Sequence, residues 1–322
     1  MRISLVGAFN LADGYLGAAK ALRKLGHEVL FVPAYMYRSE FPETHVDLIA
    51  KDLEEQNPDV ILWWRAETLK ASELGLMRKK FKQGFAFFSW DDPYQWEDPI
   101  NQIDKKCPFL DVVFTCCQGS RAMYKRFGAK QVFYCLPGFD KEIHYPDYDE
   151  NYKCDISLVC TNLYDKIQTR EPHISRRALI DKILEQIPGV DLRLYGPAGF
   201  SEIYPQHYRG WVPFDQSRKV FSSSKINLNS HICPYAFMYL NERTTQILGS
   251  GGLLFVDAVN GIDKIFKNNE CVVMDPNNFT DQLKHILFNY APYEEMRKRG
   301  LEKALQDLSW DSWAKTVTEG IV

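Results

Sequence analysis

A regular alternation of short apolar segments with amphipathic ones is the feature that most constrains the fold. In residues 2–32 an apolar run ends at Gly7, a stretch with helical periodicity stops at Gly26, and a second apolar run follows. Parallel strands need a long crossover connection, which is usually a helix. The alternation therefore predicts an α/β fold built on parallel sheets.

The same alternation of strand-like and helix-like segments continues through the rest of the chain. We expect strands at residues 2–8, 28–32, 59–63, 85–89, 111–115, 132–135, 155–160, 191–195, 225–228, 253–256 and 271–274. We expect helices at 15–25, 46–56, 72–82, 101–106, 120–127, 175–186, 214–222, 242–248, 280–288 and 293–305, and a last amphipathic helix with Trp310, Trp313 and Val317 on one side.

The length of the chain favours two domains, because 322 residues exceed a typical single hydrophobic core. A turn-rich stretch at 136–155 carries Pro137–Gly138, Pro146 and an acidic run at 147–151. We place the boundary inside it. The domains are then expected at residues 1–145 and 146–307, each a Rossmann-like α/β unit.

Composition excludes several functional classes. A net charge of −3 gives no global basic surface for nucleic acid, although it leaves a local patch open. The eight cysteines form no CxxC pair and no metal-ligand spacing, so we expect reduced thiols, no bound metal and a cytoplasmic protein. No apolar run approaches the roughly 20 residues of a membrane span, and no signal peptide is expected. Nothing in the sequence indicates an oligomeric state.

The segment 240–257, LNERTTQILGSGGLLFVD, concentrates polar side chains at a predicted helix start. Backbone N–H groups at a helix start are unpaired and favour anions. Gly249, Gly251 and Gly252 are expected to end this helix. The preceding strand directs its carboxyl end at the same place, where ligands bind in open α/β sheets.

Several short motifs resemble those of a known architecture. They are LYGP at 194–197, YRGWV at 208–212, SKINLN at 224–229, an N-x-R followed by a glycine pair at 241–252, the segment IFKNNECVVMDPNNFTDQLKHIL and the SW near the end. In this order they resemble the GT-B glycosyltransferases, and among them the spore-maturation (CgeB-type), group 1-like family. In the first half, only the alternation and WDDP at 90–93 support the resemblance.

The resemblance implies two Rossmann-like domains that face each other across a cleft. The second domain would hold a nucleotide-sugar donor (a UDP- or GDP-sugar), and the first would hold a hydroxyl acceptor, for which we favour a glycan. The last helix, 308–322, would cross back to the first domain. No cofactor beyond the donor is implied.

One departure concerns the donor ribose. Many retaining relatives carry a glutamate five residues before the second-domain glycine Gly251, where this chain has Gln246. A neutral amide binds a hydroxyl more weakly than a carboxylate does. Glu242 is four residues earlier on the same helix face and is the alternative ribose ligand.

Other candidate donor contacts follow from residue chemistry. Cations after the strand 155–160 would balance diphosphate charge, although the same residues suit a solvated helix start. The resemblance implies that the segment 210–212 lies against the nucleobase, so that Trp211 would stack on it or Val212 would offer backbone hydrogen bonds, unless Trp211 packs on its own domain. Gly196 would allow close ligand approach. His231 ends a strand, where a structural role is the alternative. The full set is Arg170, Arg176, Tyr195, Gly196, Trp211, Val212, His231, Asn241, Glu242, Arg243, Thr244, Thr245 and Gln246.

Acid–base chemistry is assigned to the first domain. Asp91 and Asp92 follow the strand 85–89, where a carboxylate would accept the proton of an attacking hydroxyl. The alternative is a turn cap, because Asp-Pro commonly opens turns. Asp13, in the first loop, is a further candidate. No DxD-like metal site, Ser-His-Asp order, HExxH or Walker pattern is present, so we expect metal-independent transfer.

Two other functions stay open at this point. Gln246 motivates a non-catalytic, two-domain protein that binds a nucleotide sugar. A GT-B-fold epimerase would need a carboxylate and histidine set facing the sugar, and the first domain shows no clear set. A nucleic-acid acceptor is less expected than a glycan because the net charge is slightly negative.

Overall fold

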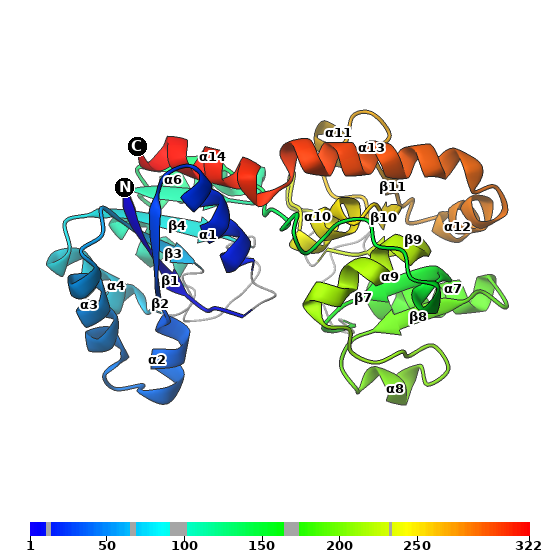
Figure 1. The fold of residues 1–322 in the computed structure, drawn as a ribbon, viewed down its shortest axis with the longest axis horizontal. Helices are drawn as coiled ribbons and strands as arrows, with labels where there is room; N and C mark the ends of the chain where they lie inside the picture. Colours follow the sequence, from blue (N-terminus) through cyan, green and yellow to red (C-terminus); the bar gives the residue numbers. More distant parts are fainter. Residues whose placement is uncertain (11–13, 65–68, 91–101, 164–173, 232–233) are drawn as a thin grey trace. The chain divides into compact units, whose positions relative to one another are not determined.

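The computed structural model describes residues 1–10, 14–64, 69–90, 102–163, 174–231 and 234–322. The chain forms two compact units (Figure 1). Unit 1 comprises Met1–Gly138, Ala236–Tyr239 and Trp310–Val322, and unit 2 comprises Phe139–Tyr235 and Leu240–Ser309. The division falls between Gly138 and Phe139, inside the turn-rich stretch and ahead of the 145/146 position expected from sequence. No helix in the described ranges is long and apolar enough to cross a membrane.

Unit 1 is built on a parallel six-stranded sheet in the order β2-β1-β3-β4-β5-β6. Its strands are β1 (Arg2–Gly7), β2 (Glu28–Val32), β3 (Val60–Trp64), β4 (Gly84–Ser89), β5 (Val112–Thr115) and β6 (Gln131–Tyr134). Its helices are α1 (Tyr15–Lys24), α2 (Ala34–Glu40), α3 (His45–Gln56), α4 (Ala71–Lys80), α5 (Ile103–Lys106), α6 (Arg121–Arg126) and α14 (Trp310–Ile321), with short 3-10 turns η3 (Cys107–Phe109) and η4 (Gln118–Ser120).

The inner strands of the unit 1 sheet are buried along most of their length, which is why β3 and most of β4 are apolar rather than alternating. Successive side chains of a strand point to opposite faces. Trp63 accordingly packs with residues of α3 and α4, whereas Trp64 packs with residues of α1 and α14.

An aromatic cluster attaches α14 to this unit, where the helix lies alongside α1 (Figure 1). The Trp313 ring centroid lies 5.5 Å from Trp64, 5.4 Å from Phe88 and 5.5 Å from Trp310. Gly17 of α1 makes room for the cluster, since a Cβ there would lie 2.3 Å from the Trp310 ring. Trp310, Trp313 and Val317 are all buried on one side of the helix.

Unit 2 is built on a parallel five-stranded sheet in the order β11-β10-β9-β7-β8. Its strands are β7 (Cys154–Val159), β8 (Leu192–Tyr195), β9 (Ser224–Asn229), β10 (Leu254–Val256) and β11 (Val272–Val273). Its helices are α7 (Arg176–Gln186), α8 (Phe200–Ile203), α9 (Ser217–Ser223), α10 (Glu242–Gly249), α11 (Ile262–Ile265), α12 (Phe279–Phe288) and α13 (Ala291–Asp307), with 3-10 turns η5 (Glu150–Tyr152) and η6 (Phe214–Gln216).

Helix α10 is fixed at both ends by local chemistry. Asn241 is its N-cap, with a side-chain oxygen that accepts from the Thr244 N–H at 3.1 Å. Gly251 adopts the left-handed conformation (φ of +69°), and the N–H groups of Gly251 and Gly252 donate to the carbonyls of Leu248 and Ile247. This pairing is a Schellman motif.

The expectation that Gly249 breaks the helix is wrong, because this glycine is the last helical residue. A Cβ at Gly249 would lie 2.4 Å from the Phe139 ring, so its role is to let that ring pack closely. Three short helices, α2, α8 and α11, are also additional to the expected elements.

Candidate functional site

The strand order of unit 2 places a topological switch point between β7 and β9. The chain leaves β7 toward β8 on one side and later returns to β9 on the other side. Connections that diverge in this way open a crevice at the carboxyl ends of the strands, where ligands bind in open α/β sheets. The segment after β9 and the start of α10 belong to this carboxyl edge.

Arg176 links the two strands that flank the switch point. Its Nη1 donates to the carbonyl and side-chain oxygens of Asn162 at 3.0 and 3.1 Å, and its Nη2 donates to the Ser230 carbonyl at 2.7 Å. Asn162 follows β7 and Ser230 follows β9. The guanidinium is buried and holds backbone oxygens, so its observed contacts are those of a structural clamp rather than of an exposed phosphate ligand.

The amide side chains of Asn229 and Asn241 connect the end of β9 to the start of α10. Asn229 Nδ2 donates to Asn241 Oδ1 at 3.0 Å, and Asn241 Nδ2 donates to Asn229 Oδ1 at 3.2 Å. Asn229 Nδ2 also donates to the Thr244 hydroxyl at 2.8 Å. Buried polar groups are stable only when they are hydrogen-bonded, so a fully bonded network favours a single arrangement of its side chains. Asn229 thereby sets the position of the helix N-cap.

His231 extends this network to β10. Its Nδ1 lies 2.6 Å from Asp257 Oδ1, its backbone N–H donates to Asp257 Oδ2 at 2.9 Å, and its Nε2 lies 3.3 Å from the Thr244 hydroxyl. A carboxylate only accepts, so Nδ1 carries the proton. The ring is fully buried, and both nitrogens are engaged within the protein. The observed contacts of His231 therefore support α10, which is the structural role given above as the alternative to donor binding.

Arg243 is the half-buried cation of the α10 first turn, and its Nη1 donates to Asn229 Oδ1 at 3.3 Å. Burial raises the pKa of the Cys160 thiol at the end of β7, and the charges of Arg176 and Arg243 oppose that rise. The side chains of Arg176 and Arg243 therefore bring positive charge close to the end of β7. This charge has the sign that a diphosphate requires.

The other polar side chains of α10 divide between its two faces. Glu242 and Gln246 are half-buried, whereas Thr244 and Thr245 are fully buried. The Thr245 hydroxyl donates to the Glu242 carbonyl at 2.8 Å. The Thr245 hydroxyl therefore serves the helix itself, whereas the Thr244 hydroxyl belongs to the network with Asn229 and His231.

The segment 210–212, which is expected to contact the base, adjoins the end of β8, because the Gly196 N–H donates to the Gly210 carbonyl at 3.1 Å. Trp211 is 63% exposed, so it does not pack into its own domain. Val212 is buried and packs with Tyr195. Burial raises the pKa of Tyr195 to about 12. A Cβ at Gly196 would lie 2.4 Å from both the Cys160 carbonyl oxygen and the Phe200 ring, so packing within unit 2 requires a glycine here, and the contact of Gly196 with a ligand stays a prediction.

The remaining candidates, Asp13, Asp91, Asp92 and Arg170, lie outside the described residues. In the sequence, Asp91 and Asp92 follow Trp90, which comes directly after β4. There the Ser89 hydroxyl lies 2.7 Å from the Tyr124 hydroxyl, in a buried pair.

Asn229, Asp257 and Asn162 are part of the site and were absent from the sequence prediction. A usable signal exists for the first two. Asn229 is a buried polar residue that ends an apolar strand, and Asp257 directly follows another. Polar residues at the carboxyl ends of adjacent parallel strands meet at one edge.

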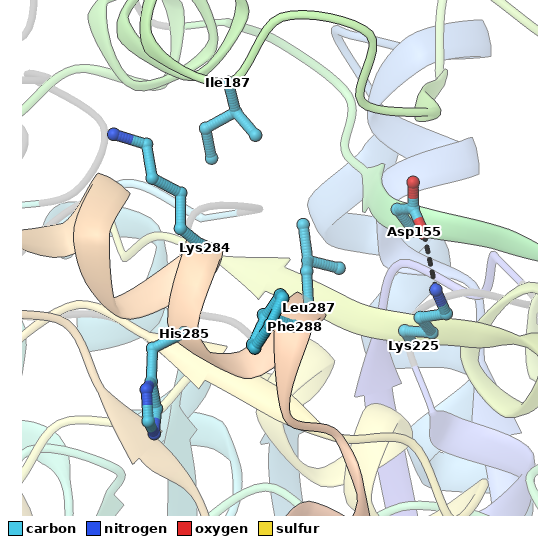
Figure 2. A pocket seen from close by; sticks show the side chains of 7 residues that line it. All are labelled: Asp155, Ile187, Lys225, Lys284, His285, Leu287 and Phe288. Atoms are coloured by element: carbon cyan, nitrogen blue, oxygen red, sulfur yellow. Dashed lines mark hydrogen bonds and ion pairs between the residues drawn. The ribbon is translucent and has the colours of Figure 1, made fainter.

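No group of three His, Cys, Asp or Glu residues within the described ranges is arranged to hold a metal ion. A hollow of about 650 Å³ lies elsewhere in unit 2, between Asp155, Lys225, Ile187 and the end of α12. Figure 2 shows the Asp155–Lys225 ion pair on one side and Lys284 and His285 on the other, with Leu287 and Phe288 between them. Asp155 and Lys225 lie near the beginnings of β7 and β9, so this hollow is at the amino edge, away from the switch point.

Comparison with known proteins gives the fold a wider context. Residues 170–319 match the model of the glycosyl transferase-like family. No curated protein matches the chain by sequence. Among solved structures, sucrose-phosphate synthase from Thermosynechococcus elongatus is similar with a TM-score of 0.72 and 13% identity, covering 99% of this chain and 98% of that one.

Two further solved structures are similar over the whole chain. HepE of Anabaena, solved with UDP-glucose, has a TM-score of 0.74 and 10% identity and covers 99% of this chain and 98% of its own. An α-glucosyltransferase solved with UDP and a 13-mer DNA has a TM-score of 0.68 and 12% identity, covering 100% and 99%. The likeness to these structures shows a GT-B fold, and the match to the glycosyl transferase-like family lies mostly in unit 2.

Proposed function

We propose that this protein is a glycosyltransferase, and that it takes its sugar from a uridine diphosphate sugar bound at the carboxyl edge of the unit 2 sheet. The observation that carries the proposal is the network of Asn229, Asn241 and Thr244, which fixes the start of α10 beside the switch point. The choice of uridine is supported by HepE, solved with UDP-glucose, and by the α-glucosyltransferase solved with UDP.

In this proposal Arg243 and the N–H groups that begin α10 hold the diphosphate. The bond between the anomeric carbon and the diphosphate oxygen breaks, and its electron pair leaves with the diphosphate. Arg243 and the helix dipole stabilise the negative charge that develops, which is the task a metal ion performs elsewhere. Transfer would then need no metal and no cofactor beyond the donor.

The ribose and the base are assigned to neighbouring side chains. Glu242 or Gln246 accepts from the ribose hydroxyls, since the two share one face of α10. Trp211 offers an exposed ring on which the base stacks. Arg170 remains a proposed diphosphate ligand. Arg176 does not bind the donor in this proposal; it holds the segments after β7 and β9 in place through Asn162 and Ser230.

The acceptor is proposed to be a glycan hydroxyl held mainly by unit 1. Its oxygen forms the new bond to the anomeric carbon, and Asp92, with Asp91 and Asp13 as alternatives, takes its proton. The seven described cysteines are all free and buried, which supports a reducing, cytoplasmic location. Membership of the spore-maturation (CgeB-type) group within the GT-B enzymes is also a proposal.

The test is incubation of the protein with radiolabelled UDP-glucose and GDP-glucose, alone and with glycan acceptors. We expect UDP-sugar binding by isothermal titration calorimetry, and slow donor hydrolysis or a labelled product. Failure to bind either nucleotide sugar would refute the proposal.

Gln246 favours one second candidate, a non-catalytic protein that binds the nucleotide sugar. Binding without hydrolysis or transfer, with any acceptor class including DNA, would support it. Conversion of the donor to an epimer without acceptor would instead identify an epimerase.

A further inference from the structure

Positive charge is concentrated at the amino edge of the unit 1 sheet, opposite the carboxyl ends of its strands. Residues 78–83 end α4 and lead into β4, and residues 121–130 form α6 and lead into β6. These two segments contain eight Lys and Arg and no Asp or Glu, although the whole chain has a net charge of −3. Local charge of the opposite sign to that of the whole protein indicates an anionic partner.

The topology of the sheet brings the two segments together. They lead into the amino ends of β4 and β6, and β5 lies between these two parallel strands. Asp111, directly before β5, links them, because its Oδ1 accepts from Arg78 Nη2 at 3.0 Å and from Lys130 Nζ at 2.6 Å. We call the six exposed cations at this edge the basic surface; they are Lys79, Lys80, Lys82, Lys125, Arg126 and Lys130.

Most of the charge of the basic surface is not neutralised by the protein. Within the described residues, Lys80 pairs with Glu54 at 2.8 Å and Lys130 pairs with Asp111 at 2.6 Å. Four cations form no ion pair in that part of the chain, namely Lys79, Lys82, Lys125 and Arg126. Neighbouring like charges repel each other, so an anion supplied from outside the chain would stabilise this edge.

The helix dipole does not explain this arrangement. Cations are favoured in the last turn of a helix, and α4 and α6 follow that rule. Helix α3 packs on the same face of the sheet and ends ahead of β3, yet its last turn contains Glu54 and Glu55 and no cation. Lys82 and Lys130 lie beyond the helix ends. The positive charge therefore belongs to the β4–β6 part of the edge rather than to helix ends in general.

The side chains that accompany the cations favour a lipid surface over nucleic acid. Leu76 is 58% exposed and lies on the same face of α4 as Lys79 and Lys80, three and four residues later. An apolar side chain beside lysines suits the boundary between lipid headgroups and acyl chains. Single-stranded nucleic acid would need exposed aromatic rings, whereas Phe81 is buried and Phe127 packs against the core. A duplex reader places a helix N-terminus in a groove, and these cations follow helix C-termini.

We propose that the basic surface docks this protein on an anionic phospholipid membrane. The ammonium groups of its lysines bind headgroup phosphates as point charges, and Leu76 enters the boundary between headgroups and acyl chains. The carboxyl ends of the unit 1 strands, to which the acid–base chemistry is assigned, face away from the membrane in this arrangement, because they form the opposite edge of the sheet. The inference is independent of the function proposed above.

Cosedimentation of the full-length protein with lipid vesicles tests the inference without any sugar donor. One set of vesicles is phosphatidylcholine alone, and the other contains about 30% phosphatidylglycerol, which is anionic. We expect the protein to bind the anionic vesicles only. Raising NaCl from about 0.05 to about 0.5 M should release most of it, because salt screens exposed charges. Equal binding to both kinds of vesicle, or binding to neither, would overturn the proposal.

A charge-reversal variant locates the contact. The triple variant Lys79→Glu, Lys82→Glu, Lys125→Glu changes exposed side chains that form no ion pair in the described ranges, so the fold should be retained. Partition onto the anionic vesicles should fall by at least about a hundredfold, because each lysine near the lipid surface contributes about fivefold. Circular dichroism verifies the fold. Partition equal to that of the wild type would overturn the proposal.

The matched control changes the net charge equally through exposed lysines of unit 2, in the triple variant Lys267→Glu, Lys284→Glu, Lys298→Glu. Its partition should stay within about twofold of the wild type, because salt screens charges that lie more than a Debye length from the lipid. An equal loss in both triple variants would show that net charge, rather than the basic surface, governs binding, and it would overturn the proposal.

Two further measurements separate lipid from nucleic acid. Leu76→Gln should lower partition onto the anionic vesicles several-fold, because it removes the apolar contact with the bilayer. Unchanged partition would overturn the placement of Leu76 in the membrane. Fluorescence anisotropy with a labelled DNA duplex is compared with vesicle binding at equal phosphate concentration. We expect weaker binding to the duplex. Tighter binding to the duplex, lost in Lys79→Glu, Lys82→Glu, Lys125→Glu, would assign the basic surface to nucleic acid and overturn the proposal.

Discussion

The two sheets share one topology and carry different chemistry at equivalent edges. In unit 1 β1 lies between β2 and β3, and in unit 2 β7 lies between β8 and β9, so each sheet has a switch point beside its first strand. In the described part of unit 1, β1 and β3 approach each other closely at this point, because a Cβ at Gly7 would lie 2.1 Å from the Trp64 carbonyl oxygen. In unit 2 it carries the amides of Asn229 and Asn241. The same topology therefore occurs twice, and in the described residues the amide network is found at the switch point of unit 2.

The largest expected effect concerns the chemistry assigned to unit 1. Asp92→Asn removes the proposed base and should lower kcat by about 10²–10⁴, the usual range for general base catalysis. UDP-glucose affinity should be preserved, because unit 2 is proposed to bind the donor. Steady-state kinetics together with calorimetry separate the two quantities. Normal turnover would reduce Asp92 to a turn cap and direct the search to Asp91 and Asp13.

The aromatic cluster of unit 1 should prove structural. Trp313→Ala removes a buried ring that contacts Trp64, Phe88 and Trp310, and truncation of a buried Trp costs about 3–5 kcal/mol of unfolding free energy. Phe288→Ala is the control, since Phe288 is 95% exposed and its loss should change stability by less than about 0.5 kcal/mol. Urea unfolding followed by circular dichroism measures both. Equal stabilities would show that the cluster does not anchor α14.

The buried network of unit 2 should couple stability to binding. Asp257→Asn leaves one of the two His231 contacts without an acceptor, and it should cost about 1–3 kcal/mol of unfolding free energy. Because His231 supports Thr244, UDP-glucose affinity should fall as well. Asp281→Asn changes an exposed ion pair with Lys284 and serves as the control. A stability loss with full donor affinity would separate the network from the site.

A further effect is a pH dependence of stability that comes from His144 of unit 2. Burial, and secondarily the charge of Arg218, lower the pKa of His144 from 6.5 to about 3. The unfolded chain then binds a proton that the folded chain does not, so stability is complete above about pH 6.5 and falls as the pH drops toward 3. The slope is at most about 1.4 kcal/mol per pH unit. Urea unfolding between pH 4 and 7 should show a shallower slope in His144→Gln; identical slopes would contradict the assignment.

Local sequence patterns were enough to place most strands and longer helices, because apolar runs and glycine stops are local signals. They failed at α2, where Tyr35 is 60% exposed and Met36 43% exposed, so its apolar residues do not mark a buried face. Helices α8 and α11 have four residues each, too few to show a helical period.

The site was harder to predict than the fold because its contacts depend on strand register. Val256 pairs with Asn229 across β10 and β9, which brings Asp257 to His231 across 26 positions of sequence. No spacing within one segment encodes that meeting. Likewise, the polar run at the start of α10 does not reveal that Thr244 and Thr245 face inward while Glu242 and Gln246 do not.

The central claim is that Arg243, held beside Asn229, binds the donor diphosphate. Calorimetric titration of wild type and Arg243→Ala with UDP and with uridine tests it most directly. Lys284→Ala, at the amino-edge hollow, serves as the control. Loss of a charged hydrogen bond costs about 1.5–3 kcal/mol, so UDP affinity should fall by about tenfold to a hundredfold while uridine affinity stays constant. Unchanged UDP affinity in Arg243→Ala, or an equal loss for uridine, would contradict the account.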